Sequence, residues 1–249
     1  FYKNNFVPPW PDDLGVSVGA TLLIDNEKTK SKNIKKYKKI NCYLGPNYSS
    51  QDIVKTFKKY KLKYKYSQNV CKETAKLIEN GKLIGWFQGK MEFTHRALGN
   101  RSILADPRSS KIKNLINSAI KYRESFRPFA PAVLYEHAND IFEIRKKEKI
   151  DYMQKAVVVK KKWRKIIPGV THSDSTARVQ TVDLQSNKKF YNLINEFYKL
   201  TKVPVLVNTS FNLNGQPIVM DPEEAIKTFY TCGLDYLVLE NYIVSKDNV

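Results

Sequence analysis

Short apolar runs recur along this chain and constrain its fold more than any other feature. Residues 83–89 read LIGWFQG, residues 203–212 read VPVLVNTSFN, and residues 236–244 read YLVLENYIV. Turn-forming residues bound these runs, which is typical of buried β-strands. Residues 127–135, RPFAPAVLY, predict a further strand with prolines at its edges.

Helical patterns lie between the runs. The clearest covers residues 107–121, where apolar residues recur at i, i+3, i+4 and i+7, with Asp106 or Ser109 as the expected N-cap. Residues 221–233 form a second, for which Asp221 is the expected N-cap.

Three more helices are expected in residues 15–24, 49–60 and 69–82, and a Lys/Asn-rich exposed loop in residues 26–39. Strands and helices mix without a strict βαβ repeat. The sequence therefore predicts an α+β, or mixed α/β, fold.

Length and composition exclude several classes of protein. At 249 residues and 42% hydrophobic content the chain can bury a core. No apolar run approaches the roughly 18–20 residues of a membrane span, so no membrane partner is expected. The three cysteines are widely spaced without a CxxC pair, which argues against a disulfide framework or zinc site and predicts a cytoplasmic location.

The formal charge of +19 has two interpretations. One is binding to nucleic acid or to an anionic surface. The other is a composition rich in Lys, Asn, Ile and Tyr, in which Lys fills surface positions by default. The lysines are scattered, with runs at 35–39, 58–65 and 160–165, which favours the second interpretation.

Arginine is distributed differently from lysine. The chain has only eight arginines, and five of them fall within the 32 residues from 96 to 127. Arginine grips phosphate or carboxylate with a planar, bidentate fork, whereas lysine is a point charge. Clustered arginine in a lysine-rich chain therefore indicates a need for guanidinium geometry.

Arg96, Lys121, Arg123 and Arg127 are the first candidates for an anion site. Together they suit a polyanionic ligand such as a nucleoside triphosphate or an acyl phosphate. The alternative is a set of ordinary salt bridges to neighbouring carboxylates, which would carry no function. Of the other clustered arginines, Arg101 and Arg108 are expected to brace the turn and the helix that follow.

Polar residues at the end of the strand in 203–212 are the second group of candidates. Asn208 and Ser210 follow the apolar run, where small polar side chains and exposed backbone N–H groups suit phosphate or sugar oxygens. Arg178 lies between small residues and an apolar run, much as Arg96 does.

Four segments together resemble the C-terminal region of the O-carbamoyltransferases, which include nodulation and antibiotic-tailoring enzymes. They occur in the family's order between about residues 81 and 220. The segments are GKMEFTHRALGNRSILADPR, KYRESFRPFAP, STARVQTV and VPVLVNTSFNLNGQPIV.

This resemblance implies a YrdC-like domain in residues 42–249, with a mixed twisted sheet flanked by helices. Residues 1–41 resemble the C-terminal tail of an actin-like ATPase-type domain, so the chain is expected to be part of a longer enzyme. In the family, the YrdC-like domain makes carbamoyl adenylate from ATP and carbamoyl phosphate. The preceding domain then transfers the carbamoyl group to a hydroxyl of a small-molecule acceptor.

The resemblance also assigns roles to individual residues. Arg96, Lys121 and Arg127 would be catalytic and, with Arg178, would contact the phosphates and the carbamoyl donor. The nucleotide and substrate site as a whole would consist of Arg96, Lys121, Arg123, Arg127, Arg178, Asn208 and Ser210.

A divalent metal, Mg²⁺ or Fe²⁺, is implied for the upstream domain, and Asp13 matches one of its ligands. The chain departs from the family pattern at two places. Thr94-His95 replaces Gly-Pro just before Arg96, and Trp10-Pro11-Asp12 replaces small residues before Asp13.

Two alternatives to the carbamoyltransferase prediction remain. One is a YrdC/Sua5-like protein of threonylcarbamoyl-adenylate and tRNA modification, and the other is a basic nucleic-acid-binding module. Under the leading prediction no nucleic-acid partner is expected, and a homodimer is left open.

Overall fold

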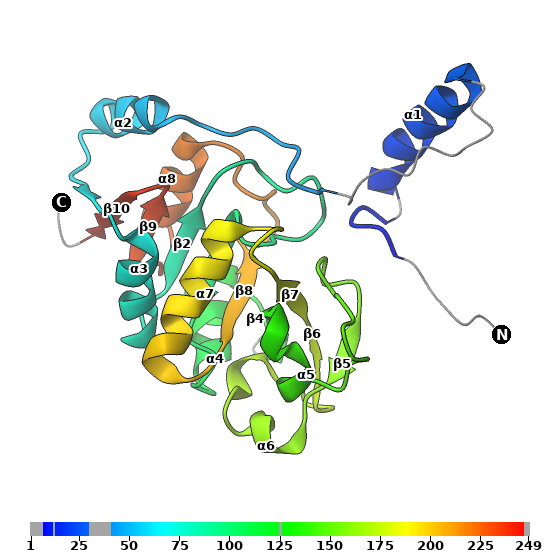
Figure 1. Ribbon diagram of the computed structural model, residues 1–249. Helices are drawn as coiled ribbons and strands as arrows, with labels where there is room; N and C mark the ends of the chain where they lie inside the picture. Colours follow the sequence, from blue (N-terminus) through cyan, green and yellow to red (C-terminus); the bar gives the residue numbers. More distant parts are fainter. Residues whose placement is uncertain (1–6, 12, 30–40, 125, 247–249) are drawn as a thin grey trace.

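The structure, a computed structural model, describes residues 7–11, 13–29, 41–124 and 126–246 (Figure 1). Eight strands form its main sheet. They are β1 (Lys65–Tyr66), β2 (Ile84–Phe87), β3 (Arg101–Ala105), β4 (Ala130–Leu134), β7 (Gln180–Val182), β8 (Val205–Ser210), β9 (Tyr236–Leu239) and β10 (Tyr242–Ser245).

The strand order is β1-β10-β9-β2-β3-β8-β4-β7. The β2–β9 and β4–β7 pairs are parallel and the other neighbours are antiparallel. A second sheet pairs β5 (Ala156–Val158) with β6 (Thr176–Arg178). All positions of β2, β3 and β4 are buried, so both faces of the main sheet are covered there.

The helices are α1 (Asp13–Thr29), α2 (Ser50–Lys59), α3 (Val70–Glu79), α4 (Ile112–Ile116), α5 (Ala138–Ile141), α6 (Lys161–Arg164), α7 (Lys188–Thr201) and α8 (Pro222–Tyr230), and a π-helical turn η1 (Asn117–Lys121) extends α4. Helices α3 and α7 lie side by side against the sheet, whereas α1 stands apart from it (Figure 1). The expected α+β, or mixed α/β, architecture is confirmed.

Side-chain caps begin two of the helices, and the cap predicted at Asp221 is confirmed. The Ser49 hydroxyl accepts a hydrogen bond from the Asp52 N–H, and the Asp52 carboxylate accepts one from the Ser49 N–H. In α8 the Asp221 carboxylate accepts from the Glu224 N–H, with Pro222 in the first turn. Each cap satisfies backbone groups that would otherwise lack a partner.

Two boundaries differ from the prediction. The helix expected from residue 107 begins only at Ile112, because the Asp106 carboxylate binds the Arg108 N–H and guanidinium and closes a separate turn. The strand expected across 236–244 is a hairpin, since Glu240 adopts a left-handed φ of 50° between β9 and β10. Of the loop expected at 26–39, residues 26–29 belong to α1 and the rest lies outside the described residues.

Candidate functional site

A cavity of ≈ 410 Å³ lies at the C-terminal end of β8. The register explains its position. Strand β8 runs antiparallel to β3 and β4, with Ser210 opposite Ser102 and Asn208 opposite Ala130. The end of β8 therefore meets the segments that enter β3 and β4, which carry the clustered arginines.

Six of the seven predicted ligand-binding residues line this cavity, from four separate stretches of chain. They are Arg96, Arg123, Arg127, Arg178, Asn208 and Ser210. The seventh, Lys121, lies directly behind Ser210. Met153 and His172 are also among the lining residues.

The cavity gathers positive charge without neutralising it. None of its described lining residues is Asp or Glu. Burial, Arg96 and Arg123 lower the pKa of Arg178 to about 10. Burial and Arg127 likewise lower the pKa of Arg123. The arginines are close enough to repel one another, which is the electrostatic signature of an anion site.

The guanidinium groups are mostly not engaged with protein. Arg123 donates to the Asn117 Oδ1 at 2.8 Å and lies over the ring of Phe129. Within the described ranges, no hydrogen bond or ion pair holds the guanidinium groups of Arg96, Arg127 and Arg178. Their donors are available to a ligand.

Residues 88–100 form the loop that presents Arg96, and Glu92 organises this loop from within. The buried Glu92 Oε1 accepts the N–H groups of Leu98 and Asn100, both at 2.7 Å. Burial raises the pKa of Glu92 against the lowering effect of these N–H bonds. Gly99 has a φ of 104°, and a Cβ there would lie 2.2 Å from the Phe190 ring, so only glycine fits.

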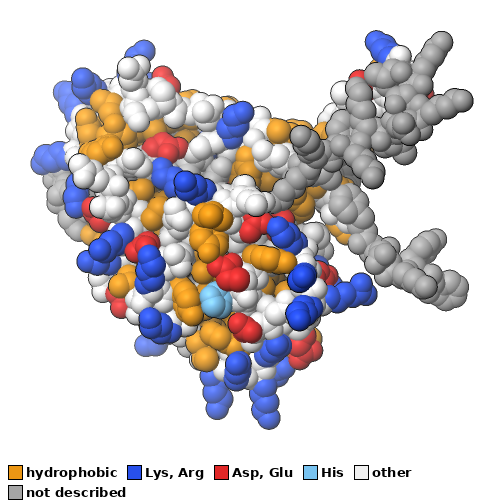
Figure 2. Space-filling view, viewed as in Figure 1, with side chains coloured by type: hydrophobic (Ala, Val, Ile, Leu, Met, Phe, Trp, Pro, Cys, Tyr) orange, Lys and Arg blue, Asp and Glu red, His pale blue; other side chains and the backbone are white. Residues whose placement is uncertain are grey.

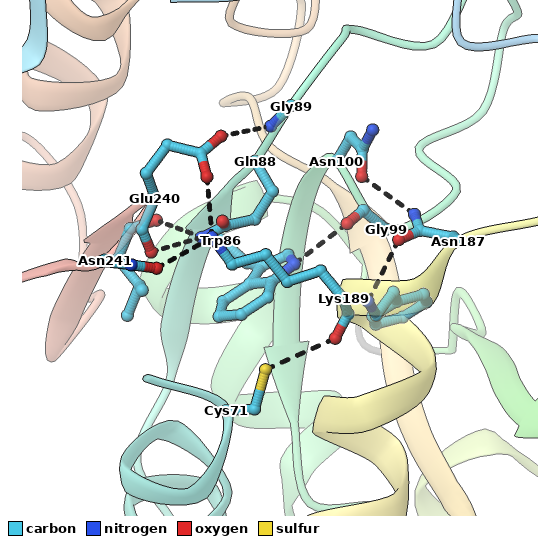
Figure 3. Close-up of polar contacts among 12 residues, drawn as sticks. Cys71, Trp86, Gln88, Gly89, Gly99, Asn100, Asn187, Lys189, Glu240 and Asn241 are labelled. Carbon is cyan, nitrogen blue, oxygen red and sulfur yellow. Dashed lines mark hydrogen bonds and ion pairs between the residues drawn. The ribbon is translucent and has the colours of Figure 1, made fainter. Parts of the chain in front are cut away.

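Side chains from neighbouring elements fix the two ends of the same loop (Figure 3). Asn187 donates to the Asn100 Oδ1, and the Trp86 indole donates to the Gly99 carbonyl. At the other end Glu240, which also pairs with Lys189, accepts from the Gly89 N–H. Hydrogen bonds therefore hold the backbone that presents Arg96 at both ends of the loop and from within it, without any ligand.

Arg101 and Arg108 brace the structure, as predicted. Arg101 is fully buried, donates to the carbonyls of Gln88, Gly89 and Pro46, and stacks on Phe87. Arg108 pairs with Asp106 at 2.6 Å. Neither lines the cavity.

Asn208 is held by a relay of side-chain amides. The Gln180 Nε2 donates to the Leu98 carbonyl at 2.9 Å, which leaves the Gln180 Oε1 as an acceptor. The Asn208 Nδ2 donates to that oxygen at 2.8 Å and to the Ala97 carbonyl at 3.1 Å. The relay fixes which way the Asn208 amide points.

Lys121 supports the turn after β8. Its Nζ lies 2.7 Å from the Ser210 carbonyl and 2.6 Å from the Asn212 Oδ1, and it also donates to the Asn212 carbonyl. Burial and Arg123 lower the pKa of Lys121 to about 7, whereas these oxygens favour its charged form. In this structure the ammonium group holds the turn rather than lining the cavity.

Sequence reasoning missed three residues around the cavity. Glu92 was not among the predicted site residues, and its role in binding backbone N–H groups has no local signal. Gln180 begins β7, whereas Arg178 ends β6 of the other sheet, so the two-residue spacing between them gave no signal. His172 lines the cavity half-buried, and burial together with Lys113 and Arg178 lowers its pKa.

Asp13, the predicted metal ligand, lies at the first turn of α1. The described residues contain no group of three or more His, Cys, Asp or Glu side chains that could hold a metal ion. This part of the chain therefore does not by itself fit a metal site, and we assign no reaction step to a metal. No helix in the described ranges is long and apolar enough to cross a membrane.

Among solved structures, the crystal structure of full-length HypF in its phosphate- and nucleotide-bound form resembles this chain. The match has a TM-score of 0.51 at 20% identity and covers 70% of this chain and 25% of that one. It supports the fold, a mixed sheet flanked by helices.

Curated relatives are nearer in sequence. Nodulation protein NolNO of Sinorhizobium fredii is 40% identical over 98% of this chain, and NolO of Bradyrhizobium diazoefficiens is 39% identical over 98%. The chain spans only 36% and 45% of those two proteins. The family model described as Carbamoyltransferase C-terminus matches residues 75–246, and the chain belongs to this family.

Proposed function

We propose that this chain is the C-terminal part of an ATP-dependent O-carbamoyltransferase. It binds ATP and carbamoyl phosphate and forms carbamoyl adenylate, from which the carbamoyl group passes to a hydroxyl of a small-molecule acceptor. Residues 42–249 act as the YrdC-like domain, and residues 1–41 as the end of a preceding actin-like domain. The family match and the similarity to nodulation proteins support this assignment.

The observation that carries the proposal is the cavity of unneutralised arginines. Carbamoyl phosphate supplies carbamate by hydrolysis, with release of phosphate. A carbamate oxygen then attacks the α-phosphorus of ATP, the bond to the β-phosphate oxygen breaks, and pyrophosphate leaves. Two anions must meet for this step, and cations are needed to offset their repulsion and the charge that develops.

Arg96, Arg127 and Arg178 have the geometry for this work because their guanidinium groups are not held by other described residues. Arginine forks orient the phosphates as well as neutralising them. Lys121 contributes by fixing the Ser210–Asn212 turn and by adding positive charge behind it. The acceptor hydroxyl later attacks the carbamoyl carbon and AMP leaves.

The distribution of lysine gives little support to a nucleic-acid-binding module. Figure 2 shows Lys and Arg side chains spread over the visible face and its rim, with acidic side chains between them. Nucleic-acid binders instead concentrate basic residues along one groove or stripe. Tight binding to random RNA that falls steeply with salt would favour the module instead.

The test is pyrophosphate release by the full-length polypeptide that carries this chain, supplied with ATP and carbamoyl phosphate. We expect release to require both substrates and Arg127→Ala to abolish it while the circular dichroism spectrum stays unchanged. Arg145→Ala, at an exposed position outside the cavity, is the matched control and should retain activity. A folded wild-type preparation without ATP-dependent turnover would refute the proposal.

A further inference from the structure

The cavity has two chemically different ends. Arg96 and Arg127 are exposed and mark its outer end. Its buried lining is apolar, formed largely by Ala97, Ala130 and Met153, each no more than 5% exposed. A phosphate suits the outer end, where guanidinium groups meet water. The inner end suits a small uncharged group attached to that phosphate.

One polar side chain interrupts the apolar inner end. Asn208 is 1% exposed and lines the cavity. Its Nδ2 is used twice, on the Gln180 Oε1 and the Ala97 carbonyl. Among the described residues, its Oδ1 has no hydrogen-bond partner.

The orientation of this amide is not interchangeable. If Asn208 were turned over, its oxygen would face the Gln180 Oε1 and the Ala97 carbonyl, two acceptors that cannot donate to it. Gln180 cannot turn over in compensation, because its own Nε2 is bound to the Leu98 carbonyl. The side chain therefore keeps an acceptor, and not a donor, without a partner beside the inner end.

A buried acceptor without a partner costs free energy unless a ligand supplies a donor. The two substrates assigned above differ in what they offer there. ATP carries its donors on the ribose and the adenine, and its phosphates bring only acceptors, whereas the carbamoyl group sits next to a phosphate and ends in an NH₂ with two N–H donors. Oδ1 is matched to this amino group by its chemistry and by the small apolar space around it.

We infer that Asn208 is a specificity-determining residue that reads the carbamoyl NH₂ through its Oδ1. This inference rests on the proposed function and adds a reason why the site would select a carbamoyl group over other small acyl groups. An acetyl group has the same shape but carries a methyl in place of the NH₂. A bound acetyl group would leave the Asn208 Oδ1 without a hydrogen-bond donor, so the site should discriminate against it.

The experiment compares pyrophosphate release by the full-length polypeptide with carbamoyl phosphate and with acetyl phosphate at equal ATP. The wild type should prefer carbamoyl phosphate. Asn208→Leu, which keeps the size but lacks the acceptor, should reduce the ratio of the two kcat/KM values at least tenfold. Asn208→Asp keeps an acceptor oxygen, so it should keep the preference while both rates fall.

Thr209→Val is the matched control on the same strand and cavity wall. It should change the kcat/KM values for carbamoyl phosphate and acetyl phosphate by the same factor and leave their ratio unchanged. This is the result expected of a substitution that disturbs only the structure of the cavity wall. If Asn208→Leu does not fold, Asn208→Ala answers the same question. An unchanged ratio in a folded Asn208→Leu or Asn208→Ala variant overturns the inference alone. No turnover with carbamoyl phosphate by the wild type overturns the proposed function and this inference together.

Discussion

Arg178→Met should stabilise the ligand-free protein while it weakens anion binding. Burial and the nearby Arg96 and Arg123 lower the pKa of Arg178 from its usual value to about 10. A lowered pKa in a basic group means that the fold disfavours its charge. Methionine fills a similar volume without that charge and retains the packing of the side-chain stem.

The size of the gain follows from the pKa. At about 1.4 kcal/mol per pH unit, the lowering corresponds to an upper bound of about 3 kcal/mol. Arg178 is partly exposed, and solvent screening reduces this to about 1–2 kcal/mol. For a domain of this size, the melting temperature should rise by about 2–8 °C.

Ligand binding should change in the opposite direction. ATP at 100 times its Kd stabilises a protein by about 2.7 kcal/mol, and a tenfold loss of affinity cuts this to about 1.4 kcal/mol. Thermal unfolding with and without ATP measures both effects, with Arg145→Met as the control that should alter neither. A lower melting temperature without ATP, or an undiminished ATP shift, would refute the reasoning.

Three further predictions concern the structure around the cavity. Arg101→Met should destabilise the protein by about 3–5 kcal/mol in urea unfolding, because buried carbonyls lose their donor. Arg108→Met should cost at most about 1 kcal/mol, because its ion pair is partly exposed. Equal losses of stability in the two variants would contradict this reasoning. Glu92→Ala should lower the free energy of unfolding by about 2–4 kcal/mol, since the N–H groups of Leu98 and Asn100 lose their acceptor. It should also weaken ATP binding measured by calorimetry, because these groups lie in the loop that presents Arg96. Unchanged ATP binding would argue against a preorganised loop. Because the folded pKa of His172 lies below 6.5, the unfolded chain binds the proton first and stability falls as pH drops through that value. His172→Gln should reduce this fall in melting temperature, and a parallel pH profile would count against it.

Much of the fold could be predicted because its signals are local. The Ser49 and Asp221 caps act within one turn, and the buried strands at 84–87 and 205–210 are marked by apolar runs. The start of the helix at Ile112 could not be predicted in this way. The Asp106 carboxylate can either cap a helix or bind Arg108, and both choices fit the local sequence. In the structure the carboxylate binds Arg108, two residues further along the chain, and does not cap the helix.

The candidate site was predictable by residue type and less so by role. Clustered arginine indicated where guanidinium groups gather, and the cavity places Arg96 and Arg178 together. The role of Glu92 depends on a loop whose backbone N–H groups converge on one oxygen. The relay through Gln180 depends on the β4–β7 pairing. Neither arrangement leaves a trace in residue spacing.

The strand order of the main sheet determines when the cavity can form during folding. Asn208 pairs with Leu104 and with Ala130, so strands about a hundred and about eighty positions apart must meet before the cavity exists. Such distant pairings close late and slowly during folding. Nascent or truncated chains should therefore lack any partial affinity for the proposed nucleotide ligand. Retention on immobilised ATP would then serve as a quality check that reports a completed sheet.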